Sequence, residues 1–464
     1  MLPSMLARRT PGPSSLSAAT RASVRRRWLS PLSSSVKTDQ TRSDAILHEY
    51  RISMDEIREM ARTPPTPMSL QQMKIFADGT HKTRLIAASF LHKELPIRFA
   101  HAITQLSELP VGLSETESVQ RAMRVYANAI TSIRALKSPS TATDDLEFTE
   151  VLRQSKASGT NLVPLICGGL RELSETDMGH HVLAMDNVQE DIKESLDKFF
   201  LARIGIRMLI GQHVESLVRI GGRVEIVNVE ETVRSACDRA AHLCKTYCGV
   251  APEVEIVITT SVEAPFTYVE SHLHHMVFEL VKNAMRATVE FHEDLQHKKP
   301  GRINKVRQVM DPHCRSLGFV MPALEDIGGV TVYPDIRKYR RPGELPPVQI
   351  VLCQGHEDLT IKVSDDGGGV PRSNWHKLWH YGYTTSPSYP PQESYGYHSF
   401  REHFSGGGYG LPIARLFARY FGGEVSFISL EGSGSSAFIQ AHRLGTRTEM
   451  VPGLASFSLQ PLYH

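Results

Sequence analysis

Five side chains within residues 274–288 have types and a spacing that could do chemistry on one face of a helix. On a helix that turns about 100° per residue, an imidazole, a carboxylate, an amide and two cations fall on one narrow stripe. These residues are His275, Glu279, Lys282, Asn283 and Arg286. Apolar residues fall on the adjoining, core-facing side, with Asn283 at the border. Taken alone, the stripe is equally consistent with a solvated face, although such a face usually carries scattered Lys and Glu pairs.

A strand-end carboxylate follows later in the chain, in the pattern Asp365-x-Gly367-x-Gly369. It comes directly after an apolar run that predicts a buried strand. A carboxylate at this position could accept a hydrogen bond from an exocyclic amine such as that of adenine. The glycines would permit close backbone approach and positive φ. Without other evidence, a plain turn is the commoner explanation of this pattern.

A second glycine run, Gly406-x-Gly408-x-Gly410-Leu411-Pro412, is expected to open a helix. Free N–H groups at a helix N-terminus bind anions, and the helix dipole favours phosphate there. Pro412 suits the first helical turn, where no N–H is missed. The spacing matches neither the common phosphate loop nor the dinucleotide fingerprint. On its own, a flexible linker into a helix explains it equally well.

The composition is that of an ordinary globular protein, with 41% hydrophobic and 22% charged residues in a chain of 464. This length predicts two or three domains. A net charge of +2 without a basic, aromatic-interleaved stripe gives no sign of nucleic-acid binding. No run reaches the about 18 apolar residues of a transmembrane helix. Cys237, Cys244 and Cys248 recur at helical intervals, which favours a buried helix face over a metal site.

The N-terminal segment differs from the rest of the chain. Residues 1–38 contain no Asp or Glu, six arginines and many serines. This composition predicts a mitochondrial transit peptide over residues 1–40. The alternative is a disordered basic tail that binds an acidic partner.

Hydrophobic periodicity divides the remaining chain at Gly221-Gly222. Residues 41–220 are expected to form an N-terminal α-helical bundle. Its predicted helices are 44–61, 69–76, 83–106 with an interruption at Pro96, 115–136, 145–159, 161–173 and 187–220. Residues 221–445 are expected to form an α/β sandwich, which makes the fold α+β. Its predicted strands are 224–229, 254–259, 348–353, 359–363, 424–430 and 437–442, and its helices are 231–247, the one bearing Asn283, and 411–421.

Three stretches fall outside these elements. Residues 293–346 have poor periodicity and predict an insertion or a partly disordered stretch. Residues 371–408 are rich in Pro, Ser, Tyr and Gly and predict a mobile loop or lid. Residues 446–464 are expected to be a C-terminal tail.

The order of these motifs resembles the GHKL (Bergerat) ATP-binding fold. K-N-A-M-R-A-T-V-E (282–290), S-D-D-G-G-G-V-P (364–371) and G-Y-G-L-P-I-A-R (408–415) are similar to the mitochondrial kinases of 2-oxoacid dehydrogenase complexes. In the helical half, H-K-E-L-P-I-R-F-A (92–100) and R-I-G-I-R-M-L (203–209) resemble the same family. The resemblance covers nearly the whole chain after the predicted transit peptide.

This resemblance implies a role for each matching residue. Asn283 would coordinate Mg²⁺, Glu279 would be the general base, and His275 one turn earlier could share a proton with it. Asp365 would hold adenine, and Arg286 would lie near the nucleotide or pair with a neighbouring acid. The other residues expected to bind ATP are Gly367, Gly369, Thr384, Thr385, Gly406, Gly407, Gly408, Tyr409, Gly410 and Leu411.

The implied protein is a serine kinase of the mitochondrial matrix that uses Mg-ATP. It would phosphorylate and inactivate the E1α subunit of a 2-oxoacid dehydrogenase complex, dock on the lipoyl domain of the E2 core and form a homodimer. Pyruvate dehydrogenase is the first choice of target, because R-A-T-V-E (286–290) looks pyruvate-type. The branched-chain complex is the alternative, because R-I-G-I-R-M-L looks branched-chain-type.

Three features depart from the family pattern. The 293–346 stretch is longer than usual, Ser435-Ser436 replaces a common Thr-Asp, and the C-terminus lacks the Asp-Trp tail of many pyruvate-type members. The last departure leaves the dimer and lipoyl-domain contacts open.

A two-component histidine kinase is an alternative function from a different class. It would need a proline after the phosphoacceptor histidine, and no proline follows His213 in that pattern. A scaffold without turnover is disfavoured by the intact Glu279, Asn283 and Asp365.

Overall fold

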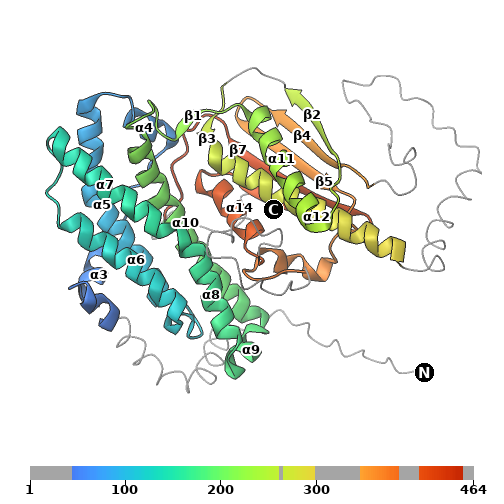
Figure 1. Ribbon diagram of the computed structural model, residues 1–464, viewed down its shortest axis with the longest axis horizontal. Coiled ribbons are helices and arrows are strands. Elements are labelled where there is room, and N and C mark those ends of the chain that lie inside the picture. The colour runs from blue at the N-terminus through green and yellow to red at the C-terminus, as the bar shows by residue number, and fades with distance from the viewer. Residues whose placement is uncertain (1–43, 261–264, 298–344, 386–406, 453–464) are drawn as a thin grey trace, which may run out of the picture.

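A helical half and an α/β half make up the computed structural model, which describes residues 44–260, 265–297, 345–385 and 407–452 (Figure 1). The helical half contains α3 (Met54–Ala61), α4 (Leu70–Ile75), α5 (His81–Ser107), α6 (Glu117–Arg134), α7 (Ala142–Ser158), α8 (Leu162–Ser174), α9 (Asp177–Leu183) and α10 (Asp186–Glu215). The long helix α5 packs against α3, α6 and α10. The predicted helical bundle is therefore confirmed.

Several predicted helix limits are wrong. Helix α5 continues through Pro96, because burial of Leu95, Pro96 and Phe99 in the core outweighs the lost backbone hydrogen bond. The single helix predicted for 44–61 breaks before α3, where Arg51 takes a φ of 56° and Ser53 caps the new helix. Helix α10 ends five residues before the predicted limit, and the seven-residue α9 was not predicted.

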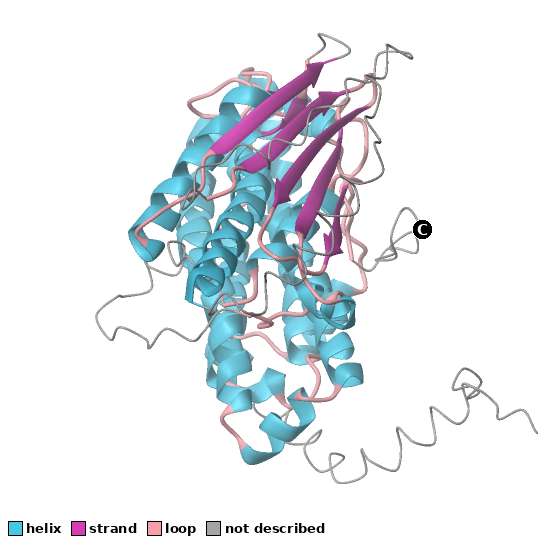
Figure 2. Cartoon of the chain, turned by 90° about the vertical axis from the view of Figure 1, so that its right-hand side faces the viewer, coloured by secondary structure: helices cyan, strands magenta, loops and turns pink. Residues whose placement is uncertain are grey.

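The α/β half is a five-stranded sheet with helices on one side (Figure 2). Its elements are β1 (Val224–Ile226), α11 (Val229–Cys248), β2 (Val254–Thr260), β3 (Thr267–Val269), α12 (Glu270–His297), β4 (Val348–Gln354), β5 (Asp358–Asp365), α14 (Gly410–Tyr420), β6 (Glu424–Leu430) and β7 (Gly434–His442). The strand order is β2-β4-β5-β7-β6, and only β2 and β4 are parallel. The predicted two-layer α+β architecture is confirmed.

The first predicted strand of this half is too long. It stops at Ile226 because the Asn228 side chain accepts a hydrogen bond from Glu231 N at 3.2 Å and caps α11. Its partner β3 was not predicted, because three residues give too little alternation to detect. The three helical cysteines all lie on α11, with Cys237 and Cys244 buried.

The chain returns to the helical half after β7. Gln71 N donates to Gly445 O at 3.1 Å, and Glu449 N donates to Met68 O at 2.9 Å. Residues 449–452 of the predicted tail are thus packed against the fold, whereas residues 446–448 are exposed. The predicted transit peptide, residues 298–344 of the insertion and residues 386–406 of the lid lie outside the described residues. Within the described part of the chain, no helix is both long and apolar enough to cross a membrane.

Candidate active site

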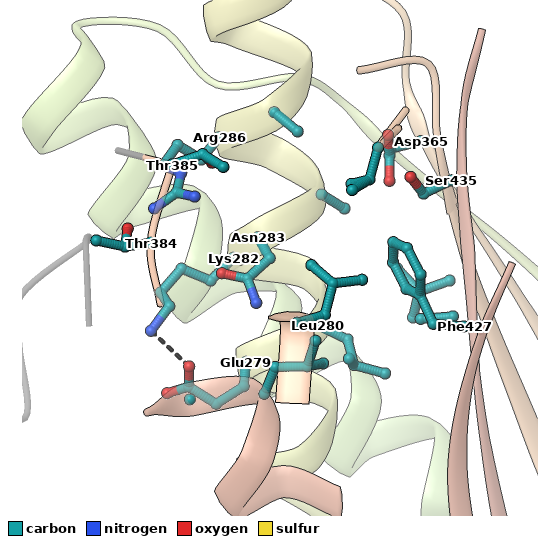
Figure 3. A pocket seen from close by; sticks show the side chains of 18 of the residues that line it. Glu279, Leu280, Lys282, Asn283, Arg286, Asp365, Thr384, Thr385, Phe427 and Ser435 are labelled. Atoms are coloured by element: carbon teal, nitrogen blue, oxygen red, sulfur yellow. Dashed lines mark hydrogen bonds and ion pairs between the residues drawn. The ribbon is translucent and has the colours of Figure 1, made fainter. Parts of the chain in front are cut away.

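A pocket lies between α12 and the sheet, where the first turn of α14 meets α12 (Figure 3). Helix α12 contributes Glu279, Leu280, Lys282, Asn283, Ala284, Arg286 and Ala287. The sheet contributes Val363, Asp365, Phe427, Ser435 and Ala437. The remaining lining residues are Val370, Leu378, Tyr383, Thr384, Thr385, Gly408, Gly410, Leu411 and Pro412. Segments from four distant parts of the sequence therefore meet at one site.

Asp365 occupies the sheet end of the pocket. It is the last residue of β5 and pairs in register with Ser435 of β7. Its Oδ1 accepts a hydrogen bond from Gly367 N at 2.9 Å. Burial raises the pKa of this carboxyl to about 6, against the backbone N–H groups of Gly367 and Ser435, which lower it. An acceptor beside the ring of Phe427 suits a flat heterocycle that carries an amino group (Figure 3).

The glycines after Asp365 shape the backbone rather than line the pocket. A Cβ on Gly367 would lie 2.6 Å from Ala287 Cβ, so only glycine lets this loop approach α12 so closely. Gly369 has a φ of +69°, and a Cβ there would overlap the backbone of Leu430. From the sequence, both glycines were expected to bind ATP. In the structure they lie beside the pocket and allow the close approach of the backbone around it.

Glu279 and Lys282 form a buried ion pair at the opposite end of the pocket. Lys282 Nζ lies 2.6 Å from Glu279 Oε2 (Figure 3). The two side chains are only 4% and 9% exposed. Burial opposes ionisation of the carboxyl, but the charges of Lys282 and His275 outweigh it and hold the pKa of Glu279 below its usual value. This part of the polar stripe is therefore buried rather than solvated, and its acid remains a carboxylate.

Helix α14 begins directly against this carboxylate. A Cβ on Gly410 would overlap Glu279 Oε2. A Cβ on Gly408 would lie 2.5 Å from the backbone of Gly382 and Tyr383, so the approach to the helix is equally close. The helix has no side-chain cap hydrogen bond among the described residues. Its first N–H groups are available for an anion.

Cationic and hydroxyl side chains surround the space between these two ends. Arg286 lies beside Thr385, and Asn283 and Lys282 follow it on α12, with the Lys282 ammonium directed at Glu279 (Figure 3). Arg286 Nε also lies 3.5 Å from Glu290 Oε1, so this side chain both lines the pocket and pairs with a neighbouring acid. The Asn283 amide supplies an oxygen of the kind that Mg²⁺ accepts. This donor set fits a divalent cation held mainly by phosphate oxygens and water.

Besides Gly367 and Gly369, three other predicted residues that the structure describes do not line the pocket. The His275 ring packs against Phe417, with 5.1 Å between the ring centroids, and its charge contributes to the lowered pKa of Glu279. Tyr409 is buried, and its side chain is hydrogen-bonded to Cys167 of the helical half. Gly407 takes a φ of +59° in the turn before α14, whereas Gly406 lies outside the described residues.

The sequence reasoning missed several lining residues, among them Phe427, Ser435, Leu378 and Tyr383. Phe427 and Ser435 lie on neighbouring strands whose pairing is not visible in the sequence. Leu378 and Tyr383 belong to a segment recognised only as loop-like. Its two short 3-10 helices, Arg372–Asn374 and His376–Trp379, have no periodic signal.

Comparison with known proteins gives two matching family models. A model described as mitochondrial branched-chain alpha-ketoacid dehydrogenase kinase matches residues 67–219. A model described as histidine kinase-, DNA gyrase B-, and HSP90-like ATPase matches residues 336–444. Together they correspond to the helical half and to the later part of the α/β half.

Three relatives that match most of this chain are all described as pyruvate dehydrogenase (acetyl-transferring) kinases. A mitochondrial pyruvate dehydrogenase (acetyl-transferring) kinase of Arabidopsis thaliana is 33% identical, over 86% of this chain and 96% of the relative. Isozyme 1 of Rattus norvegicus is 33% identical, over 84% and 80%. The Drosophila melanogaster protein of the same description is 30% identical, over 84% of each chain.

Proposed function

The chain belongs to the mitochondrial 2-oxoacid dehydrogenase kinase family, and we propose that it uses Mg-ATP to phosphorylate a serine of an E1α subunit. Phosphorylation would inactivate the dehydrogenase complex that contains this subunit. One observation carries the proposal. The carboxylate of Glu279, the amide of Asn283 and the uncapped first turn of α14 share one pocket, with Asp365 at its far end.

The two ends of the pocket suit the two ends of ATP. Asp365 would accept a hydrogen bond from the adenine amine while the ring lies beside Phe427. The phosphates would reach the first turn of α14 and the hydroxyls of Thr384 and Thr385. This orientation leaves the terminal phosphate near Glu279, where a substrate hydroxyl has to enter.

The chemistry needs positioning and charge neutralisation more than covalent participation. Asn283 would hold Mg²⁺ together with phosphate oxygens and water, and the ion would neutralise charge on the phosphates. Glu279 would accept the proton of the serine hydroxyl as that oxygen attacks the terminal phosphate. Its low pKa keeps it ready as a carboxylate. The charge of His275, whose ring packs against Phe417, would help to keep Glu279 ionised.

Pyruvate dehydrogenase is the target we favour, because relatives that match over most of the chain carry that substrate in their names. The branched-chain complex is the second candidate, because the model that matches residues 67–219 is described by that substrate. Family membership also supports residence in the mitochondrial matrix and docking on the lipoyl domain of an E2 core.

We also propose a homodimer. Strand β6 is an edge of the five-stranded sheet. Its Ile428 and Leu430 are 55% and 68% exposed. Exposed apolar side chains on an edge strand that pairs with only one other described strand form a surface that a second copy would cover. Sedimentation of the protein and of an Ile428→Glu/Leu430→Glu variant tests this proposal, and an unchanged dimeric mass would remove β6 from the interface.

Histidine phosphorylation finds no support at His213. Its side chain is 2% exposed and lies 3.1 Å from both Asp145 and Thr149. A phosphoacceptor has to reach the terminal phosphate, and this imidazole is held inside the helical half.

The deciding experiment incubates the protein with purified pyruvate dehydrogenase complex or purified branched-chain complex and labelled ATP. We expect acid-stable label on serine of the pyruvate-type E1α and a parallel loss of dehydrogenase activity. Faster labelling of the branched-chain E1α would select the alternative target. Acid-labile label on the kinase itself would indicate a histidine kinase, and no label at all would indicate a scaffold.

A further inference from the structure

A buried carboxylate, Glu449, joins the C-terminal segment of the chain to both halves of the fold. It lies beyond residue 444, where the ATPase family match ends. Its side chain is 0% exposed, and that of its partner Arg98 is 5% exposed. A carboxylate so fully removed from water requires several donors.

Those donors come from three separate elements. Arg98 of α5 donates from Nη2 to Glu449 Oε1 at 2.7 Å and from Nη1 to Oε2 at 3.0 Å. Met68 N donates to Oε1 at 3.1 Å. The hydroxyl of Tyr420, the last residue of α14, donates to Oε2. Arg98 is further bound to Glu94 Oε1 at 2.8 Å. We call Glu449, Arg98, Glu94 and Tyr420 the Glu449 cluster.

A glycine in the middle of α10 makes room for this cluster. A Cβ on Gly205 would lie 2.9 Å from Arg98 Nη1 and 3.2 Å from Glu449 Oε2. Glycine inside a helix costs about 1 kcal/mol relative to alanine. Its presence in the interior of a 30-residue helix is explained by the close approach of Arg98 and Glu449.

The cluster contacts the C-terminal end of α14. This helix has 11 residues, with Gly410 in the pocket and Tyr420 in the cluster. Met450 N also donates to Tyr420 O at 2.8 Å, so the C-terminal segment holds both the backbone and the side chain of that residue. A short helix moves as a rigid unit, so a shift at Tyr420 displaces the first turn at Gly410.

We propose that Glu449 is a positioning residue that ties α14 to the helical half and so holds its first turn where nucleotide phosphates bind. The proposal rests on the proposed function, because it requires ATP phosphates at α14. In this proposal, the contacts of Glu449 with Arg98 and Tyr420 couple the helical half to the nucleotide site. The helical half would also carry the docking contacts.

The test compares two buried ion pairs. Glu449→Gln keeps the shape but removes the charge that binds Arg98. Asp145→Asn does the same to the Arg84–Asp145 pair, which has a 2.6 Å contact and side chains 12% and 5% exposed, but lies in the helical half away from α14. For both variants and the wild type, the affinity for a non-hydrolysable ATP analogue with Mg²⁺ is titrated and the melting temperature is measured.

We expect Glu449→Gln to weaken nucleotide binding by about two- to thirty-fold, a usual range for changes that alter coupling between sites. Asp145→Asn should lower the melting temperature without changing the affinity. If both variants weaken binding equally, Glu449 has only a general structural role and the proposal is overturned. Unchanged affinity in Glu449→Gln also overturns it while leaving the proposed function intact.

A second variant covers the case in which Glu449→Gln does not fold. Tyr420→Phe removes only the α14 hydroxyl and leaves the Arg98–Glu449 pair in place. We expect a smaller loss of affinity from it, and wild-type affinity would overturn the proposal. Absence of nucleotide binding by the wild-type protein would instead refute the proposed function.

Discussion

Lys282 Nζ lies 2.6 Å from Glu279 Oε2, and both side chains are buried one helical turn apart on α12. A lone carboxylate in this position would be driven toward its protonated form by burial. The ammonium of Lys282 reverses that tendency and keeps Glu279 ionised. The first turn of α14 lies directly against this pair, because a Cβ at Gly410 would overlap Glu279 Oε2. The acid that would accept the substrate proton is therefore prepared before any substrate arrives.

Removing the ammonium should change the pH dependence of the kinase. In Lys282→Met, burial of Glu279 is no longer opposed by its main partner, so its pKa rises. Because the protonated acid cannot accept a proton, the acid limb of kcat/KM should move to higher pH. Lys245→Met, at an exposed lysine of α11, is the control. An acid limb that does not move would mean that Lys282 does not govern the base.

The same ion pair should make the stability of the fold depend on pH, with stability lost at low pH. The folded-state pKa of Glu279 lies below its ordinary value of 4.5. The ionised carboxylate therefore stabilises the fold above that value, and this contribution is lost as the pH falls through the folded-state pKa. Acid unfolding of Lys282→Met should begin at higher pH than that of the Lys245→Met control.

Asn283→Ala removes the proposed Mg²⁺ ligand while leaving a good helix former. We expect kinase activity to collapse and the melting temperature to change little, because the amide lines the pocket rather than the core. Asn161→Ala is the matched control, since that side chain is exposed and makes no cap hydrogen bond with the described residues of α8. Normal Mg²⁺-dependent turnover by Asn283→Ala would remove this residue from the metal site.

Asp365 should make nucleotide affinity depend on pH. Burial raises its pKa to about 6, and the adenine amine donates best to the ionised form. Affinity for the adenine nucleotide should therefore fall as the pH is lowered through about 6. Asp365→Asn should bind weakly at every pH and lose this dependence, whereas Asp365→Ala should abolish binding. Titration with a fluorescent analogue measures both effects, and an unchanged affinity in the Ala variant would reduce Asp365 to a turn residue.

The helix residues and the strand-end acid of the candidate site could be identified from the sequence because they lie in periodic elements or beside them. The 3.6-residue period placed Glu279, Asn283 and Arg286 on one stripe, and the end of an apolar strand marked Asp365. What covers the stripe was not predictable. The turn that meets Glu279 comes from Gly410, which is distant in sequence, and only tertiary packing brings the two together.

In the fold too, features set by the local sequence could be predicted, whereas features set by contacts between distant residues could not. Most long helices and strands were predicted, because repeated apolar positions identify them. The short β3 and α9 were missed, since three and seven residues carry little periodic signal. The predicted interruption at Pro96 was wrong because core packing overrides the local preference of proline. Burial of Glu449 could not be predicted at all, because its partner Arg98 lies in the first half of the chain.

Glu279→Gln separates chemistry from binding. The amide keeps the size and helix propensity of the side chain but cannot accept a proton. Nucleotide affinity should stay within a few-fold, while single-turnover transfer to E1α falls about 10²–10⁴-fold. The lower end of this range is reasonable, because a loose transition state asks little of a base. Weakened ATP binding with a small loss of rate at saturating ATP would instead assign Glu279 to the nucleotide or the metal.

The ion pair supplies the control for this variant. Glu279→Gln leaves the buried ammonium of Lys282 without its counter-charge, so the fold should lose stability. The double variant Glu279→Gln/Lys282→Met removes both charges and should recover much of the melting temperature. Transfer should remain as slow as in the single variant, because the proton acceptor is still missing. If transfer recovers together with stability, the loss in Glu279→Gln came from an unpaired lysine, and Glu279 is not the base.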